Sequence, residues 1–386
     1  MKIELITKRE DLAVLAPRWD ELALSDSRDG FFRTSGWYCA WMEHIRPDAQ
    51  PFVIVVRNND GDLVGLAPLC RGAYRDLGIQ LNSIFWAGRE VVSGDFLDFL
   101  ADAEVRPQVI AAILEYLQEN RSRWGLLVLG ELVDGADSYM ALEVLAKQHD
   151  LALRRQEERI CPYIALPAKF EDYLGTLGSS TRYHIRRRMR DVERTGARVE
   201  VFEAGQDMPV HLDSLIRLHL ARWNKDNLPG TMGRDGFAPF LRQICTNPPK
   251  GSRCRLYQLT HEETPVASLL TFHFGESALY YQAGWDPDSS LAALSPAVVL
   301  MAHSIRDAIQ LGLRYYEFLR GDEAYKSRWS KTCRKTATLL LGRSFAAKQY
   351  LRVSAIKDLV KRSFQQHGET LRDDAATEQM GNHASL

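Results

Sequence analysis

The residues best suited to chemistry cluster between 317 and 329, in the stretch EFLRGDEAYKSRW. Three cations, Arg320, Lys326 and Arg328, surround a Gly-Asp turn that follows LGLRYY, an apolar run typical of a buried strand. Guanidinium and ammonium groups at the end of a strand can bind a carboxylate or a phosphate. A solvated, charged loop uses the same residue types, so this stretch alone leaves both interpretations open.

A second cationic segment precedes it, SSTRYHIRRRMRDVERTGARV, which contains seven arginines and two acidic residues. At helical spacing the apolar residues Ile185, Met189 and Val192 share one side. The arginines, including Arg182 and Arg186, form a stripe on another side. Such a stripe suits phosphate or carboxylate groups, RNA or DNA, or solvent around a charged helix face.

Two further stretches combine a strand with a place for a ligand. LYYQAGWDP, which contains Gln282, is followed by SPAVVLMAHSI, where Ser295 suits a helix cap and Pro296 the first helical position. The unpaired N–H groups of such a helix start can receive an anion, although a plain capped helix is the commoner arrangement. In SGDFLDFL, Asp95 lies beside aromatic residues, where it is either a functional acid or a solvated one.

The sequence predicts both helices and strands, and these elements must position the residues named above. Apolar spacing predicts helices around residues 8–26 and 170–195, and Asn-Asp-Gly-Asp predicts a hairpin inside PFVIVVRNNDGDLVGLAPLCRG. Paired helices, an antiparallel meander and then strand–helix–strand recur in both halves, which predicts an α+β fold. We expect an N-terminal domain over 1–155, a C-terminal domain over 156–345, and a helix followed by a disordered tail over 346–386.

Composition and short motifs argue against a metalloprotein, a membrane-spanning protein and a secreted protein. The six cysteines are scattered, with no C-x-x-C pair and no H-E-x-x-H, so we expect no metal site and reduced thiols in a cytoplasmic protein. No apolar run is long enough for a transmembrane helix, and the first residues lack a signal core. His219, near Arg222 on an expected helix, favours a packed histidine over a catalytic base.

Charge is distributed unevenly along the chain. Residues 1–150 carry 15 Lys+Arg against 24 Asp+Glu, whereas residues 320–362 carry 12 against 3. This separation suggests that the C-terminal half meets an anionic ligand.

Taken in order, these stretches resemble one family, the GNAT-superfamily acyltransferases of the CelD/BcsL type, which are related to the FemAB peptidyltransferases. The resemblance runs over roughly residues 1–345. It rests on FFRTSGWYCAW, GDLVGLAPLCR, SGDFLDF, STRYHIRRRMRDVE, YYQAGWDP, the Ser-Pro helix start and YEFLRGDEAYK. The resemblance implies two tandem GNAT-like domains with a FemAB-like arrangement.

The resemblance also implies transfer of an acyl group, acetyl in the simplest case, from acyl-CoA to an amine on a small molecule, a glycan or a cell-envelope precursor. Lys326 matches the lysine that closes the last motif, Asp95 matches an acid of the N-terminal domain, and Glu317 is the alternative acceptor of the amine proton. The residues expected to bind donor or substrate are Arg182, Arg186, Arg222, Gln282, Ser295, Arg320 and Tyr325.

One stretch departs from the family pattern, so alternatives to an acyl-CoA-dependent acyltransferase stay open. SSLAALSPAVVL lacks the R/Q-x-x-G-x-G/A glycines with which ordinary GNAT enzymes hold the CoA pyrophosphate. An aminoacyl-tRNA-dependent peptidyltransferase of the FemAB type is therefore one alternative, and a non-catalytic RNA-binding protein is another. Peripheral membrane association and the oligomeric state stay open.

Overall fold

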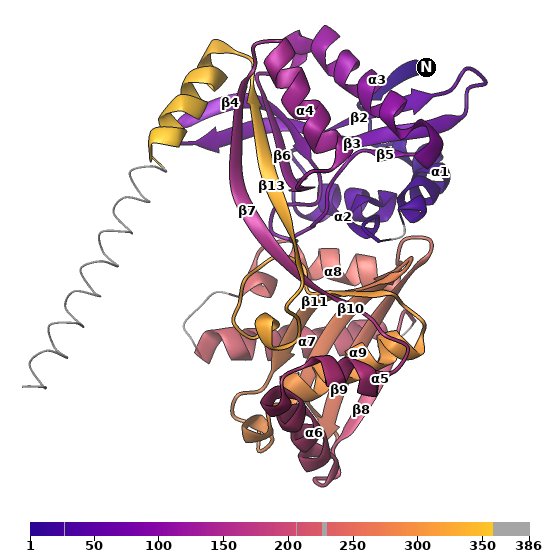
Figure 1. Cartoon of the computed structure of the whole chain (residues 1–386), viewed down its shortest axis with the longest axis vertical. Helices are drawn as coiled ribbons and strands as arrows, with labels where there is room; N and C mark the ends of the chain where they lie inside the picture. The colour runs from indigo at the N-terminus through magenta and orange to yellow at the C-terminus, as the bar shows by residue number, and fades with distance from the viewer. Residues whose placement is uncertain (27, 206, 226–229, 358–386) are drawn as a thin grey trace, which may run out of the picture.

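The chain folds into two α+β halves whose strands are joined in one sheet (Figure 1). A computed structural model describes residues 1–26, 28–205, 207–225 and 230–357. The strand order is β1-β2-β3-β4-β6-β13-β7-β12-β11-β10-β9-β8, and β5 pairs with β3. The predicted α+β class is confirmed.

The N-terminal half begins with an edge strand and is covered by amphipathic helices. The predicted hairpin is confirmed, because β2 and β3 pair antiparallel on either side of the Asn-Asp-Gly-Asp turn. The elements of this half are β1 (Lys2–Ile6), α1 (Leu12–Ser25), α2 (Ser35–His44), β2 (Gln50–Arg57), β3 (Leu63–Asp76), β4 (Ile79–Trp86), β5 (Leu100–Ala101), α3 (Arg106–Glu119), β6 (Leu126–Val133) and α4 (Asp137–Gln148).

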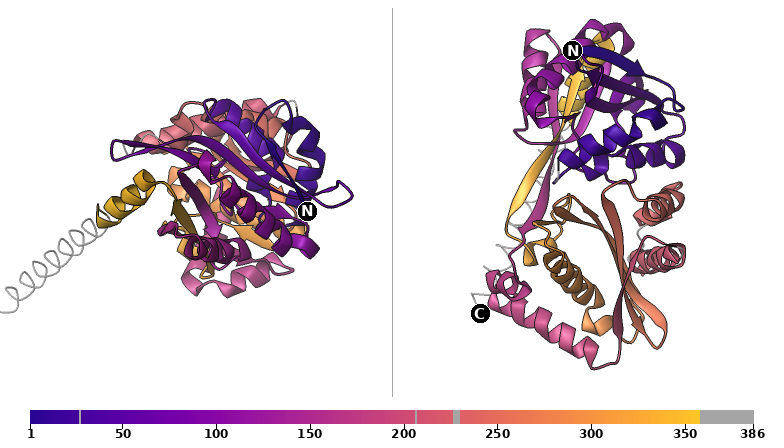
Figure 2. Two further views of the ribbon diagram at one scale, coloured as in Figure 1. Left: turned by 90° about the horizontal axis from the view of Figure 1, so that it is seen from above. Right: turned by 90° about the vertical axis from the view of Figure 1, so that its right-hand side faces the viewer.

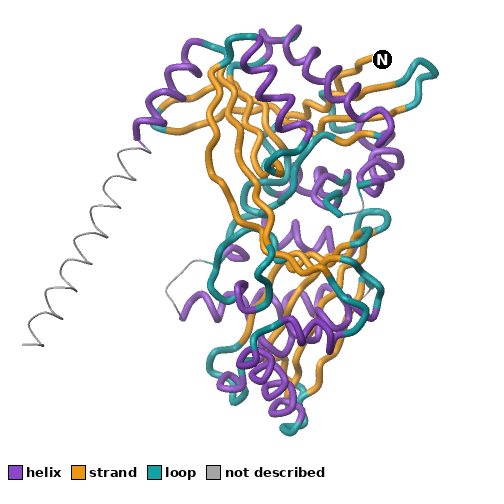
Figure 3. Tube along the Cα trace, viewed as in Figure 1, coloured by secondary structure: helices purple, strands orange, loops and turns teal. Residues whose placement is uncertain are grey.

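The C-terminal half has helices on both faces of its sheet, with α5, α6 and α9 on one face and α7 and α8 on the other (Figures 2 and 3). Its elements are β7 (Ala152–Ala165), α5 (Phe170–Thr176), α6 (Ser179–Glu193), β8 (Arg198–Glu203), α7 (Met208–Lys225), α8 (Phe237–Thr246), β9 (Ser252–His261), β10 (Thr264–Phe274), β11 (Ser277–Trp285), α9 (Pro296–Gln310), β12 (Tyr315–Glu317) and β13 (Cys333–Gly342).

The single long helix expected over 170–195 is wrong. Leu177 and Gly178 have extended backbone, with ψ of 153° and 147°, which ends α5 and begins α6. Since the helical hydrogen bonds are interrupted there, the arginine-bearing helix α6 is a separate element.

Two long strands join the halves (Figure 1). β7 pairs with β13 along most of its length and with β12 at residues 163–165. β13 pairs on its other side with β6, which belongs to the N-terminal half. The expected C-terminal range 156–345 therefore contributes its last strand to the N-terminal part of the sheet.

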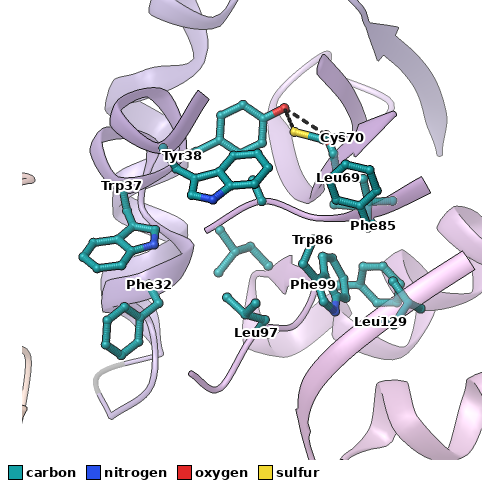
Figure 4. Close-up of a cluster of buried hydrophobic side chains, with 14 of the residues drawn as sticks. Phe32, Trp37, Tyr38, Leu69, Cys70, Phe85, Trp86, Leu97, Phe99 and Leu129 are labelled. Carbon is teal, nitrogen blue, oxygen red and sulfur yellow. Dashed lines mark hydrogen bonds between the residues drawn. The ribbon is translucent and has the colours of Figure 1, made fainter. Parts of the chain in front are cut away.

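Aromatic side chains fill the space where the halves meet. Figure 4 shows the N-terminal part of this core, in which the rings of α2 face strand residues such as Leu69 and Phe85. The Phe31 ring stacks on Phe272 of β10 at a centroid distance of 4.5 Å. Trp37 of α2 meets Phe240 of α8 edge-on at 4.8 Å. Such aromatic pairs hold the halves together beyond the effect of burial alone.

A final helix spans residues 345–357 and packs on the β3–β4 hairpin. The Tyr350 hydroxyl donates to Asp76 Oδ2 at 2.8 Å and hydrogen-bonds to the Tyr74 hydroxyl at 2.9 Å. The helix expected within 346–386 is present as far as residue 357. The predicted disordered tail lies outside the described residues.

Candidate functional site

A pocket opens in the C-terminal half where two neighbouring strands separate. β12 pairs with β11 only at residues 277–279, whereas β11 continues to Trp285. Beyond residue 279, β11 stays paired with β10 but, among the described residues, has no partner strand on its β12 side. A cavity of about 330 Å³ lies beside this open edge, between the start of α9 and the segment 325–329. The short pairing leaves backbone groups of β11 free to meet a ligand.

The pocket is aromatic and cationic. Its walls include the rings of Tyr280, Trp285, Tyr325 and Trp329, together with the guanidinium groups of Arg222 and Arg328. The Arg222 guanidinium lies 4.3 Å from the Trp285 ring centroid, within cation–π range. Among the described residues, the lining contains neither a carboxylate nor a histidine. This arrangement favours a ligand that carries both an anionic group and an apolar or planar part.

The start of α9 forms one wall of the pocket. Ser295 has a left-handed backbone, with φ of 58°, and its carbonyl accepts the N–H groups of Val298 and Val299 at 2.9 and 3.4 Å. Pro296 occupies the first helical position as expected, but the Ser295 side chain does not cap the helix, so that prediction is wrong. The left-handed geometry moves the hydroxyl away from the first N–H groups.

A buried group of charges lies at the junction of the halves, behind the segment 319–326. Asp95 Oδ2 accepts the backbone N–H of Arg320 at 2.9 Å, and its Oδ1 lies 3.4 Å from Arg320 Nε. Arg320 also pairs with Glu131 of β6. Burial, helped by the nearby Glu131 carboxylate, raises the pKa of Asp95 to about 6 against the opposing charge of Arg320. An N-terminal carboxylate thus holds the backbone of a C-terminal loop.

Glu317 belongs to a second set of charges at the same junction. Its Oε1 accepts from Arg28 Nε at 2.9 Å and lies 3.2 Å from Arg334 Nη2. Arg334 also makes a bidentate pair with Asp29, with both distances at 2.8 Å. Burial raises the pKa of Glu317, while Arg334 and Arg28 lower it. Because all four side chains are at least partly buried and mutually paired, they fix the relative position of the halves.

Lys326 lies between the pocket and these charges. Its Nζ is buried, donates to the Arg320 carbonyl at 2.7 Å and pairs with Glu323 at 2.9 Å. Its neighbours in the chain, Tyr325 and Arg328, line the pocket. The structure thus shows Lys326 holding the loop, and its predicted action on a ligand charge stays a prediction.

Four predicted binding residues do not line the pocket, namely Arg182, Arg186, Gln282 and Arg320, of which Arg320 belongs to the junction. Arg182 donates to the Gly175 carbonyl at 3.4 Å, and Arg186 pairs with Glu171 on α5. Gln282 is half-buried on β11. Of the ten predicted residues, the pocket brings together Arg222, Ser295 and Tyr325, and the junction brings together Asp95, Glu317, Arg320 and Lys326.

A close approach between α7 and β11 positions Arg222. A side chain at Gly284 would meet the backbone N of His219 at 2.2 Å, so only glycine fits there. His219 Nδ1 lies 3.1 Å from the Ala283 carbonyl, and burial lowers the pKa of its imidazole to about 4. The prediction of a packed histidine is confirmed.

Sequence reasoning missed Glu131, Asp29 and Arg334. Each is a single charged residue in an ordinary strand or loop, and their partners are up to 305 residues away. Tyr280 and Trp285 stood in a quoted stretch but were not assigned roles, and Arg328 was noted only as part of the cationic cluster. The aromatic character of Tyr280 and Trp285, on the strand before the Ser-Pro helix start, was the signal that could have identified them.

Comparisons with known proteins agree with this architecture. Residues 179–327 match the family model described as an acetyltransferase (GNAT) domain. No curated protein matches the sequence. A crystal structure of FemX aligns with 87% of this chain and 97% of its own at 12% identity, with a TM-score of 0.59.

Two other solved structures are similar at 12% identity. The first is a conserved protein of unknown function from Bacteroides thetaiotaomicron, with 89% of this chain and 100% of that chain covered and a TM-score of 0.54. The second is the C-terminal domain of a putative lysylphosphatidylglycerol synthetase from Agrobacterium fabrum, with 89% and 96% covered and a TM-score of 0.53. These likenesses show the fold, and the predicted GNAT-like, FemAB-like architecture is confirmed.

Among the described residues, no group of three or more His, Cys, Asp or Glu side chains is placed to hold a metal ion. No described helix combines the length and apolar character needed to cross a bilayer.

Proposed function

We propose that this chain is an N-acyltransferase that moves an acyl group, acetyl in the simplest case, from acyl-CoA to an amine. The observation that carries the proposal is the cationic, aromatic pocket at the start of α9. Its lining lies within the residues that match a GNAT acetyltransferase domain, except for Arg328 and Trp329, which follow directly. Arg222 and Arg328 would neutralise an anionic part of the donor. Trp285 and Trp329 would pack against its apolar part.

In this reaction the protein's main task is to hold the amine and the thioester donor in the right relative position. The amine nitrogen attacks the thioester carbonyl carbon, the C–S bond breaks, and the proton lost by the nitrogen neutralises the leaving thiolate. N–H groups on the open, β12-side edge of β11, or at the start of α9, would stabilise the negative charge that develops on the carbonyl oxygen. Holding donor and amine in one pocket makes the attack effectively unimolecular.

We assign positioning roles to the charges at the junction. Asp95 and Glu317 are fully buried and already bound to arginines, so both would act by holding the loop and the strand that border the pocket. Lys326 would hold the same loop and place its charge near the pocket. The proton of the amine would then leave through water.

The resemblance to the CelD/BcsL type supports an amino sugar or another cell-envelope precursor as acceptor, in a cytoplasmic reaction. The pocket walls contain no carboxylate among the described residues, so the acceptor amine is expected to approach without an ion pair.

The test is a thiol-release assay with acetyl-CoA and longer acyl-CoA donors against a panel of amines. Calorimetry with CoA would measure donor binding separately. Arg222→Met should weaken CoA binding, whereas Arg242→Met, an exposed arginine on α8 that pairs with Asp213, is the matched control. Absence of both CoA binding and thiol release would contradict the proposal.

A second candidate is an aminoacyl-tRNA-dependent peptidyltransferase. The observation that favours it is the likeness in fold to FemX over nearly the whole of both chains. The arginines exposed on α6, among them Arg187 and Arg190, would then meet the tRNA backbone. Amide formation with aminoacyl-tRNA but not with acyl-CoA would select this function.

A further inference from the structure

The helix at 345–357 has apolar residues on two opposite faces. Ala347, Tyr350 and Leu351 are buried against the molecule. At about 100° per residue, Phe345, Val353 and Ile356 lie within an arc of roughly 80° on the far side. These three side chains are 78%, 52% and 61% exposed. An amphipathic surface helix needs one apolar face, so the second one requires a partner.

This exposed face is bordered by positive charge. Residues 342–357 contain four Lys and Arg and no acidic residue. Lys348 pairs with Asp150, while Arg352 and Lys357 are exposed and have no ion-pair partner among the described residues. The partner should therefore combine an apolar surface with negative charge.

The same molecule has a groove that combines an apolar lining with negative charge at its edges. It lies between α3 and α4, has a volume of about 850 Å³, and is lined by apolar side chains such as Ile110 and Leu114. Met140 and Val144 are 50% and 53% exposed in it. The charged residues at its edges include Glu115, Glu119 and Asp137. Among the described residues these three acids have no ion-pair partner.

The helix cannot reach the groove of its own chain with this face. Its buried face is fixed to the β3–β4 hairpin through Tyr350, which bonds to Asp76 and Tyr74, so the exposed face is directed away from the molecule. A second copy of the chain is free of that constraint. One contact would then cover both the exposed helix face and the acidic groove.

We propose that the helix 345–357 of one copy binds the α3–α4 groove of a second copy. Phe345, Val353 and Ile356 pack into the groove, and Arg352 and Lys357 face its acidic edges, as in other helix-in-groove contacts. If the exchange is reciprocal, the contact closes a two-fold dimer. An anionic membrane surface would satisfy the helix but would leave the acidic groove uncovered.

Light scattering of the full chain after size exclusion gives the first test. The expected mass is twice the 43.9 kDa of the chain, and it should fall with dilution. Ile356→Glu in the helix and Val144→Lys in the groove should each weaken self-association on the order of tenfold or more, because each removes buried apolar surface and adds an unpaired charge. Val210→Glu, at a valine of α7 that is 66% exposed, is the matched control and should leave the mass unchanged.

Two further experiments test whether the helix of one copy contacts the α3–α4 groove of the other. Arg352→Glu and Glu115→Lys should each weaken association, and the double variant should recover part of the loss. A mixture of Ile356→Cys and Val144→Cys chains should form a disulfide-linked pair under oxidation, and neither variant alone should do so to the same extent.

A wild-type chain that stays monomeric at every concentration would overturn the proposal. Binding to anionic vesicles that is lost in Ile356→Glu, by such a monomer, would assign the helix to a membrane instead. A dimer whose mass is unaffected by either charged variant would place the contact elsewhere and would also overturn it.

Discussion

Replacing Asp95 by asparagine should change how stability depends on pH. Burial raises the folded-state pKa of Asp95 to about 6, above its unfolded value of roughly 3.9. Between these two values the folded state binds the proton more tightly, so stability falls as pH rises. A difference of roughly two pKa units lowers the free energy of unfolding by about 3 kcal/mol, and this loss is complete above about pH 6.

The asparagine side chain in Asp95→Asn does not titrate, and it keeps an oxygen that can accept the Arg320 N–H. The free energy of unfolding of the wild type, relative to Asp95→Asn, should therefore fall by about 3 kcal/mol between roughly pH 3 and pH 7. Urea unfolding of both proteins across this range measures the difference, because groups that do not interact with Asp95 titrate alike in both. Asp60→Asn, at an exposed turn, shows the effect of losing one negative charge.

A flat difference, or one that rises with pH, would refute this reasoning. It would mean that the attraction of Arg320 outweighs burial, so that Asp95 is held as a stable carboxylate. The junction would then be tightened by its charges at neutral pH rather than weakened by the cost of burying them.

Three other changes test the assigned roles by steady-state kinetics, with folding checked by thermal melting. Arg222→Met should raise KM for the donor on the order of tenfold with kcat little changed, since it removes a charged contact in the ground state. Lys326→Ala should lower kcat and kcat/KM together on the order of 100-fold if the lysine acts in the transition state, whereas wild-type values would leave it only a minor role in the loop. The double change Arg182→Ala and Arg186→Ala should weaken substrate binding without unfolding the protein, and unchanged affinity would identify α6 as a solvated face.

Local sequence signals predicted most of the fold. The hairpin followed from Asn-Asp-Gly-Asp, and the α+β class followed from alternating helical and strand periods. The pairing of β13 with β6 did not follow, because strand partners distant in the chain leave no local trace. The break at Leu177 was missed since Gly175 and Gly178 are tolerated inside a helical pattern.

The candidate site was predictable where its residues are consecutive. Tyr325, Lys326 and Arg328 were recognisable because they surround a Gly-Asp turn at the end of a strand. The roles of Asp95 and Glu131 depend on a contact with Arg320 across the junction, which only the assembled sheet creates. A resemblance in motif order could point to Asp95, but it could not tell a proton acceptor from a residue that holds a loop.

The position of β13 has a consequence for synthesis. β13 begins at Cys333, 200 residues after β6 ends at Val133, yet it lies between β6 and β7 in the sheet. While the ribosome is still making the C-terminal half, one edge of β6 has no strand beside it, and such an edge is prone to pair with other chains. Neither half can be completed before the last strand emerges, so a chain truncated ahead of β13 should aggregate rather than yield a folded N-terminal fragment.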